Sequence, residues 1–229
     1  MKYIKDELGN RMKFNYEEVY KIRLPLRLPL IIRIDGKSFH TWTKHCQKPF
    51  DLKLINAMQQ IAIEMFKHSS GCKLAYGQSD EISFLFNNFE NLTTEPWFLN
   101  ELQKIVSVTA SIASAKLSKY YQSEDIPIFD ARAFVLPVEE VENYFIWRQQ
   151  DAERNSLSSY CHSFFTSKEL NGKNKDERHE MLQKINKDWY NLNIYIKRGW
   201  CVVNKEIDNN IPNFIEHREY INKHLLKNE

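Results

Sequence analysis

The chain has 229 residues, of which 42% are hydrophobic and 27% are charged, and its formal net charge is +2. This composition predicts a globular protein with a substantial core and excludes a low-complexity or disordered chain. No apolar run approaches the length of a membrane span, and the first residues lack the apolar segment of a secretory signal. We therefore expect no membrane partner and a cytoplasmic location.

The first predicted core elements are a strand and a helix. Residues 30–34 form a short Ile-rich run between a proline and a glycine, which is typical of a buried strand. Apolar residues then recur at three- and four-residue steps over residues 52–66, which predicts an amphipathic helix that Asp51 can cap.

A hairpin, a long helix and another strand follow. Residues 73–76 and 81–86 predict two strands, and Gly77-Gln78-Ser79-Asp80 supplies the turn between them. Residues 96–121 predict a helix with many small residues that permit close packing on a sheet, and residues 132–136 predict the fourth strand. The resulting order is βαββαβ.

This order predicts an α+β protein with a ferredoxin-like fold. We expect a catalytic core with an N-terminal helix at residues 1–137, and a largely helical, locally basic extension at residues 138–229 that packs on it. Residues 168–205 contain nine Lys or Arg against five Asp or Glu. This excess favours phosphate contact only weakly, because a solvated helix surface has the same pattern.

Three carboxylates are expected at one edge of this sheet. In the ferredoxin-like order the first and third strands are antiparallel neighbours, so Asp35 at the end of one lies beside Asp80 and Glu81 at the start of the other. Such carboxylates repel unless neutralised, and Mg²⁺ accepts these oxygen ligands together with substrate phosphates. The pattern predicts two-metal phosphoryl transfer. It favours Asp35 and Asp80 over Glu81, because successive strand side chains point to opposite faces.

Acidic turn residues without any function would explain the same carboxylates. The loop Gly36-Lys37-Ser38-Phe39-His40 favours the catalytic interpretation, since glycine lets backbone amides approach an anion. Lys48 and Lys104 could reach a triphosphate as point charges, or they are exposed lysines without a partner.

Several segments occur together at the spacing of a known family. They are Arg33-Ile34-Asp35-Gly36-Lys37-Ser38-Phe39-His40, Lys48-Pro49, the run from Ala75 to Phe84, and Phe129-Asp130-Ala131-Arg132. With them the chain resembles the tRNA-His guanylyltransferase superfamily. The resemblance implies a core like the palm of polymerases that works in the reverse, 3′-to-5′ direction on the 5′ end of a tRNA.

The resemblance also implies the reaction and its partners. In this family a nucleoside triphosphate first activates a 5′-monophosphate, the 3′-hydroxyl of an incoming nucleotide then attacks it, and the resulting 5′ pyrophosphate is finally removed. The implied substrates are tRNA, ATP, and GTP or another nucleoside triphosphate. Two Mg²⁺ ions and a homotetramer, arranged as a dimer of dimers, are implied as well.

Site residues follow from the same resemblance, position by position. The implied metal group consists of Asp35, the carbonyl of Gly36, Asp80 and Glu81, with Asp35, Asp80 and Glu81 as the catalytic acids. The implied triphosphate contacts are the loop of Gly36, Lys37, Ser38 and Phe39, together with Lys48, Ser79 and Lys104. His40 and Asp51 are expected near the nucleobase.

Two positions depart from the family pattern. Eukaryotic members have His-Ile-Asn-Asn where this chain has Glu153-Arg154-Asn155-Ser156, and Glu101 replaces a triphosphate-binding arginine. The sequence Glu-Arg-Asn-Ser resembles the guanylyltransferase-like branch, whose members repair 5′-truncated tRNAs opposite a template base. We expect this function. The alternatives are addition of a single guanosine to tRNA-His, a palm-fold nucleotide cyclase and a metal-free RNA-binding module.

The RNA contacts are harder to locate. Arg154 and Asn155 are candidates for contact with the RNA 5′ end, although a polar helix surface explains them equally well. Backbone contacts dominate the binding of structured RNA, so basic residues of the extension are the candidates for phosphate contact. They are Lys173, Lys175, Arg178, Lys197 and Arg198.

Overall fold

The computed structural model describes residues 7–122 and 125–225 and is built around a six-stranded sheet in the order β4-β1-β3-β2-β5-β6. The strands are β1 (Leu30–Gly36), β2 (Cys72–Gln78), β3 (Glu81–Phe86), β4 (Phe129–Val135), β5 (Trp200–Val203) and β6 (Glu206–Asp208). Every neighbouring pair is antiparallel. The first four strands have the predicted ferredoxin-like order, with β1 beside β3.

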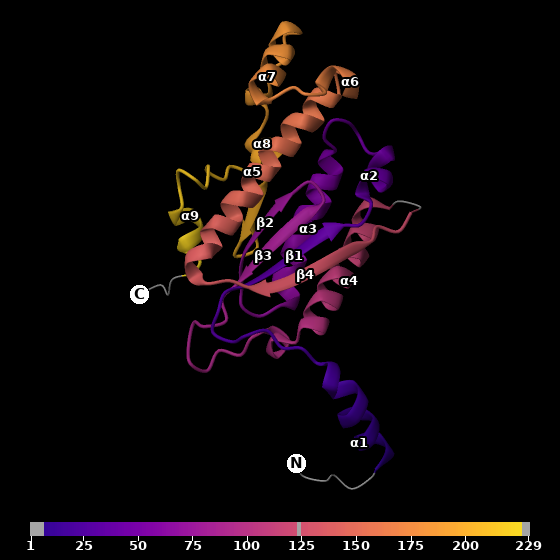
Figure 1. Ribbon diagram of the computed structural model, residues 1–229, viewed down its shortest axis with the longest axis vertical. Coiled ribbons are helices and arrows are strands. Elements are labelled where there is room, and N and C mark those ends of the chain that lie inside the picture. The colour runs from indigo at the N-terminus through magenta and orange to yellow at the C-terminus, as the bar shows by residue number, and fades with distance from the viewer. Residues whose placement is uncertain (1–6, 123–124, 226–229) are drawn as a thin grey trace.

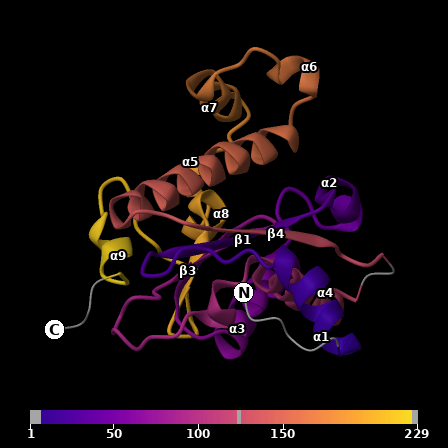
Figure 2. The same cartoon turned by 60° about the horizontal axis from the view of Figure 1, so that its bottom comes forward.

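Helices cover both faces of the sheet (Figure 2). α3 (Leu52–His68) and α4 (Leu102–Tyr121) lie on one face, and α5 (Val138–His162) lies on the other. Because strand side chains alternate, Ile32 and Ile34 pack in the core under α3 and α4, whereas Ile31 packs in the core under α5. This alternation places Arg33 and Asp35 on the α5 face, near the end of β1.

The predicted long helix begins later than expected. α4 starts at Leu102 rather than near residue 96, because Phe98, Leu99 and Asn100 have positive φ angles of 51°, 50° and 57° that an α-helix cannot contain. The buried Asn100 amide donates to the Pro25 carbonyl at 3.0 Å and fixes this irregular entry. β2 extends beyond its predicted limits at both ends, and β4 begins three residues earlier and ends one residue earlier than predicted.

Two strands of the C-terminal extension were not predicted. β5 pairs with β2 and β6 pairs with β5, so the extension adds to the sheet of the core. Its described helices are α5, α6 (Ser167–Leu170), α7 (Lys175–Lys184), α8 (Ile194–Arg198) and α9 (Glu219–Asn222). No described helix is both long and apolar enough to cross a membrane.

The junction between β2 and β5 depends on Gly77. A Cβ atom at this position would lie 2.1 Å from the ring of Trp200, which is 1% exposed. Replacing Gly77 with alanine is therefore expected to lower the free energy of unfolding by about 1–3 kcal/mol through overpacking. Urea unfolding monitored by circular dichroism would measure this loss. A Gly9→Ala control should have no such effect, because nothing lies within 4 Å of its added Cβ.

The two ends of the molecule carry smaller units (Figure 1). Residues 163–191, with α6 and α7, form a distal lobe at the end of α5, and Leu170, Leu182 and Trp189 are buried in its core. At the opposite end an N-terminal arm, residues 7–20, projects from the sheet. It contains α1 (Leu8–Met12) and two further helical turns, none of which has a buried residue.

Candidate active site

The three predicted carboxylates meet at one edge of the sheet. Asp35 is directly opposite Glu81 in the β1–β3 ladder, and cross-strand partners lie on the same face. Asp80 precedes Glu81 in the tight turn between β2 and β3, where Ser79 has a φ angle of 50°. The Ser79 hydroxyl donates to Asp80 Oδ1 at 3.0 Å. Burial raises the pKa of the Asp80 carboxyl, and the negative charge of Asp35 raises it further.

Glu81 has a partner that the sequence did not indicate. Arg148 of α5 donates from Nε to Oε1 and from Nη2 to Oε2 of Glu81, both at 2.6 Å. The two side chains are only 6% and 9% exposed. Burial raises the pKa of the Glu81 carboxyl, and the Arg148 charge opposes that rise. The Glu81 carboxylate is thus held in a buried ion pair with Arg148, whereas the resemblance implies that it ligates a metal.

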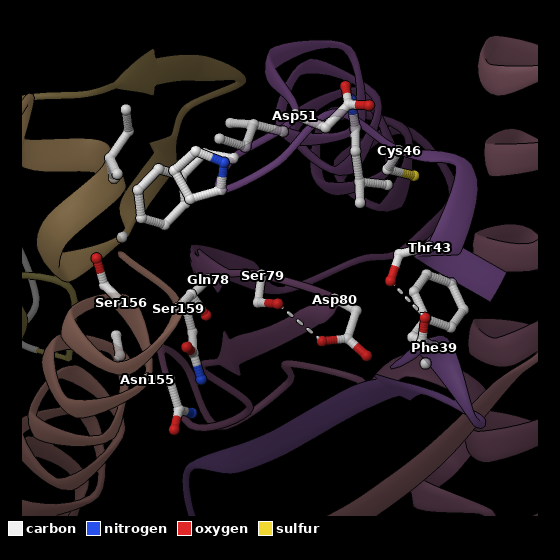
Figure 3. Close-up of a pocket in the computed structure, with 18 of the residues that line it drawn as sticks. Phe39, Thr43, Cys46, Asp51, Gln78, Ser79, Asp80, Asn155, Ser156 and Ser159 are labelled. Atoms are coloured by element: carbon white, nitrogen blue, oxygen red, sulfur yellow. Dashed lines mark hydrogen bonds between the residues drawn. The ribbon is translucent and has the colours of Figure 1, made fainter. Parts of the chain in front are cut away.

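A cavity of about 540 Å³ opens beside Asp80. Figure 3 shows Asn155, Ser156 and Ser159 of α5 on the left and Asp51 at the top, with Asp80 below Asp51. The predicted residues that line this first cavity are Gly36, Ser38, Phe39, His40, Lys48, Asp51, Ser79, Asp80 and Asn155. The structure therefore brings most of the predicted nucleotide contacts to one space.

The loop after β1 is tightly folded against this cavity. Ser38 has a φ angle of 56°, and its carbonyl accepts from the Thr41 amide at the start of α2 (Phe39–Trp42). A Cβ atom at Gly36 would lie 2.2 Å from the Phe39 ring, so glycine is required for this close turn. Lys37 is exposed and lies outside the lining of the cavity.

Lys104 is placed elsewhere. It is exposed on α4, where its Nζ lies 5.8 Å from the Phe98 ring centre, and it does not line the cavity. Within one copy of the chain, Lys104 thus lies apart from the predicted triphosphate contacts that line the cavity.

Asp51 performs a structural role in addition to lining the cavity. Its carboxylate accepts from the Leu54 amide at 3.0 Å, as predicted for the cap of α3, and from the Gln47 amide at 3.0 Å. Tyr121 Oη donates to Asp51 Oδ2 at 2.6 Å. Although burial raises the pKa of Asp51, these hydrogen bonds lower it by more. Three donors thus hold the side chain in place at the cavity wall.

A second cavity, of about 690 Å³, is also lined by Asp80. It is lined by Asp35, Asp80 and Glu81 and also by side chains that the sequence analysis did not assign to a site. These are Arg33, Gln78, Trp147, Arg148, Asp151, Ser158 and Ser159. Two signals could have found them: Arg33 is two residues before Asp35 on the same strand face, and Arg148 and Asp151 are three residues apart on one helix face.

Arg33 makes the second cavity suitable for an anion. Its Nε is buried and has no hydrogen-bond partner among the described residues, and its guanidinium lies 6.0 Å from the Trp147 ring centre. Trp147 is 48% exposed. A cation and an exposed aromatic ring beside the carboxylates are the groups that contact the phosphate and base of a nucleic acid.

The candidate RNA contacts fall into three places. Arg154 is exposed and donates to Asp151 at 2.7 Å, and Asn155 lines both cavities. The predicted contacts in the distal lobe are Lys173, Lys175 and Arg178, at α7 and the turn before it.

Lys197 and Arg198 of α8 are instead used within the chain. Lys197 donates to the Tyr190 carbonyl, and Arg198 Nε lies 3.4 Å from Glu153 Oε1. These contacts hold α8 against the distal lobe and α5. Both cations thus have a partner within the chain, and Arg198 Nε makes no hydrogen bond among the described residues.

The oxygen atoms at this edge of the sheet suit a Mg²⁺ ion that is also coordinated by the phosphates of a bound nucleotide. Among the described residues, no group of three or more His, Cys, Asp or Glu side chains could hold a metal ion. Asp35, Asp80 and the Gly36 carbonyl supply oxygen donors, and Mg²⁺ commonly takes one or two carboxylates while phosphates and water complete its coordination. Burial raises the pKa of Asp80 and the charge of Asp35 raises it further, and a cation bound between the two carboxylates would oppose both effects.

Residues 9–137 match the model of the tRNAHis guanylyltransferase (Thg1) family, which covers more than half of the chain. The chain belongs to this family. It is therefore a nucleotidyltransferase that acts on tRNA, and the predicted resemblance is confirmed. The expected α+β fold is confirmed by the same family's solved structures, described next.

The chain is similar to Thg1-like proteins of known structure and to tRNA(His) guanylyltransferases. It is 44% identical to a bacterial tRNA(His) guanylyltransferase (Thg1)-like protein in complex with ATP, with a TM-score of 0.91 over 96% of this chain and 99% of that one. A bacterial Thg1-like protein in complex with GTP is 40% identical, with a TM-score of 0.82 over 96% and 99%. A probable tRNA(His) guanylyltransferase of Dictyostelium discoideum is 30% identical, covering 78% of this chain and 76% of that one.

Proposed function

We propose that the protein is a template-dependent 3′-to-5′ nucleotidyltransferase that repairs tRNAs lacking nucleotides at the 5′ end. The observation that carries the proposal is Glu153, which stands where eukaryotic members have a histidine and whose carboxylate faces Arg198 at 3.4 Å. A carboxylate in an ion pair cannot make the contacts of an imidazole, which donates and accepts hydrogen bonds and is neutral near pH 7. The 44% identity with a bacterial Thg1-like protein supports the same branch.

The first cavity is proposed to bind the nucleoside triphosphate. Its volume of about 540 Å³ is within the usual range for a small-molecule site, and Lys48 at its rim supplies a positive charge for the phosphates. The named complexes of bacterial relatives with ATP and GTP support both nucleotides as substrates. Asp35, Asp80 and the Gly36 carbonyl would hold Mg²⁺, which when bound supplies charge neutralisation at the reacting phosphate.

The second cavity is proposed to receive the 5′ end of the RNA, with Arg33 contacting its phosphate. In activation, a 5′-phosphate oxygen bonds to the α-phosphorus of ATP and pyrophosphate leaves. In the nucleotide-addition step that follows, the 3′-hydroxyl oxygen of the incoming nucleotide bonds to the activated 5′ phosphorus. The hydroxyl loses its proton to solvent, and AMP leaves. Asp80 lines both cavities, so one acid borders the reacting groups of both steps.

A nucleotide-addition assay tests this function. The protein would be incubated with Mg²⁺, each labelled nucleoside triphosphate in turn, and four tRNAs that lack the 5′ nucleotide and differ in the opposing base. We expect incorporation of the nucleotide that pairs with the opposing base. Guanosine addition to intact tRNA-His regardless of template would instead support the single-addition alternative, and a cyclic nucleotide formed without RNA would support the cyclase.

Self-association is proposed through the N-terminal arm. Large apolar side chains of the arm are exposed, including Val19 at 63% and Tyr20 at 77%. Such a patch on an otherwise folded protein marks an interaction surface, and a second copy of the chain is the proposed occupant.

Charged substitutions test this surface. A Val19→Asp/Tyr20→Asp variant is expected to elute as a smaller species than the wild type in size-exclusion chromatography with light scattering, since buried carboxylates disfavour an apolar interface. A Leu92→Asp variant is the matched control, because Leu92 is 89% exposed in a loop outside the arm. Equal masses for all three proteins would contradict the proposal.

A further inference from the structure

We infer that Arg148 is the positioning residue of the catalytic hairpin and that Glu81 is its anchor in place of a metal ligand. The inference rests on the nucleotidyl-transfer site described above, in which Asp80 is the last residue of the turn and directly precedes Glu81. Whatever fixes Glu81 therefore fixes the backbone that presents Asp80.

The sequence spacing of β3 and α5 builds this contact. Glu81 and Ser83 are two residues apart and share one face of β3, while Tyr144 and Arg148 are four residues apart and share one face of α5. Tyr144 Oη and Ser83 Oγ are 2.8 Å apart, which makes a second polar rung next to the Glu81–Arg148 pair. Two steps along a strand and one helical turn cover similar lengths, so both rungs form between the antiparallel elements.

Arg148 is also fixed from the other side. Its Nη2 donates to Asp151 Oδ2 at 2.9 Å, and its guanidinium lies 4.4 Å from the Trp147 ring centre. Although burial lowers the pKa of Arg148, the charges of Glu81 and Asp151 raise it by more, so the guanidinium stays charged. A planar group with two carboxylate partners has little freedom to rotate, which suits a residue that holds another in place.

Glu81 can ligate a metal only if Arg148 releases it. Release would leave the guanidinium, whose side chain is 6% exposed, facing Asp151 alone. Breaking one side of a buried ion pair is strongly unfavourable, whereas replacing both partners by neutral groups is often tolerated. This difference distinguishes the two roles of Glu81. If Glu81 were a metal ligand, a second substitution at Arg148 would not restore the activity that is lost when Glu81 is replaced.

A double-mutant cycle uses that difference. Glu81→Gln and Arg148→Gln are each expected to lower kcat about 100-fold, the effect of a misplacement of about 1 Å at a reacting group, while KM for the nucleoside triphosphate changes little. The Glu81→Gln/Arg148→Gln variant is expected to recover to within about 10-fold of wild type, because two uncharged amides can replace the pair. A double variant as inactive as Glu81→Gln alone would overturn the inference.

Thermal unfolding gives a readout that does not require turnover. Mg²⁺ added with a non-hydrolysable nucleoside triphosphate should raise Tm of the double variant as much as that of the wild type, since Asp35 and Asp80 remain. Loss of this shift in the double variant would identify Glu81 as a ligand. Tyr144→Phe is the matched control, because it removes the neighbouring rung without leaving a buried charge, and it should keep both kcat and the Tm shift.

The cycle stays informative if the repair function is wrong. Every variant is compared with the wild type in whichever nucleotidyl transfer the wild type performs, so failure to extend truncated tRNA affects the proposed function alone. Failure of the double variant to recover, with an active wild type, affects the Arg148 inference alone.

Discussion

Asp35→Asn and Asp80→Asn are each expected to lower the rate of nucleotidyl transfer by at least about 1,000-fold, because each removes an anionic oxygen from the group that would hold Mg²⁺. Asparagine keeps the size of the side chain, so the fold should be retained. Single-turnover extension of a 5′-truncated tRNA would measure the rate, and circular dichroism would verify the fold. Wild-type-like rates in either variant would contradict the metal assignment.

Asp130→Asn is the matched control for this prediction. Asp130 is the partner of Asp35 on the other side, in the β1–β4 ladder, but its side chain is 51% exposed and lies 3.6 Å from Arg132. It does not line either cavity. A rate near that of the wild type is expected, and a large loss would show that the whole rung of carboxylates is required.

The stability of the Asp80→Asn variant is expected to depend on pH differently from that of the wild type. Folding raises the pKa of Asp80 above its ordinary value of 3.8. In metal-free protein the contribution of Asp80 to the free energy of unfolding is therefore fully present below pH 3.8. This contribution is lost as the pH rises through the pKa of the folded state. Asp80→Asn should remove this loss and raise Tm near neutral pH without Mg²⁺. Thermal melts of both proteins from pH 4 to pH 8 would reveal the difference, and parallel curves would contradict it.

Lys48→Met is expected to raise KM for the nucleoside triphosphate by about 10- to 100-fold with a smaller change in kcat. Lys48 lines the first cavity and is a point charge that meets the phosphates before and during reaction, so its loss weakens ground-state and transition-state binding alike. Steady-state kinetics at saturating tRNA would separate the two constants. An unchanged KM would remove Lys48 from the triphosphate site.

Lys44→Met provides the comparison for Lys48. Lys44 is an exposed lysine of the same region, and it lies outside the lining of both cavities. Lys44 has the same charge as Lys48 and therefore makes a similar contribution to the long-range electrostatic potential of the protein. If both variants raise KM equally, the effect is long-range electrostatics rather than contact, and it should then disappear at high ionic strength.

The convergence of the acids could be predicted because it depends on strand order. Periodicity and turn residues were sufficient to place β1 beside β3, and antiparallel pairing then set Asp35 opposite Glu81. The cap of α3 by Asp51 was likewise local, since its amide donor is Leu54, three residues away. Features that depend on neighbouring residues, or on one topological rule, were accessible from the sequence.

The partner of Glu81 could not be predicted in the same way. Arg148 is 67 residues away, and its choice depends on how α5 crosses the sheet. The strand β5 was missed because its four residues follow a helix and a basic dipeptide, which favoured a helical extension. Its pairing with β2 is decided by the fit of Trp200 against Gly77, a contact that no local pattern contains.

The length of α5 has a consequence for the size of the substrate. Its residues Arg148 and Asn155 border the cavities, and the helix continues to His162, where the distal lobe begins. The seven helical steps from Asn155 to His162 correspond to about 10 Å along the helix axis. Trp189 of the lobe donates to Ser156 in the cavity wall at 3.0 Å, which ties the lobe to α5 beside the cavity. An RNA whose phosphates contacted the predicted basic residues of the lobe, Lys173, Lys175 and Arg178, would therefore have its reacting end at a fixed distance from those phosphates.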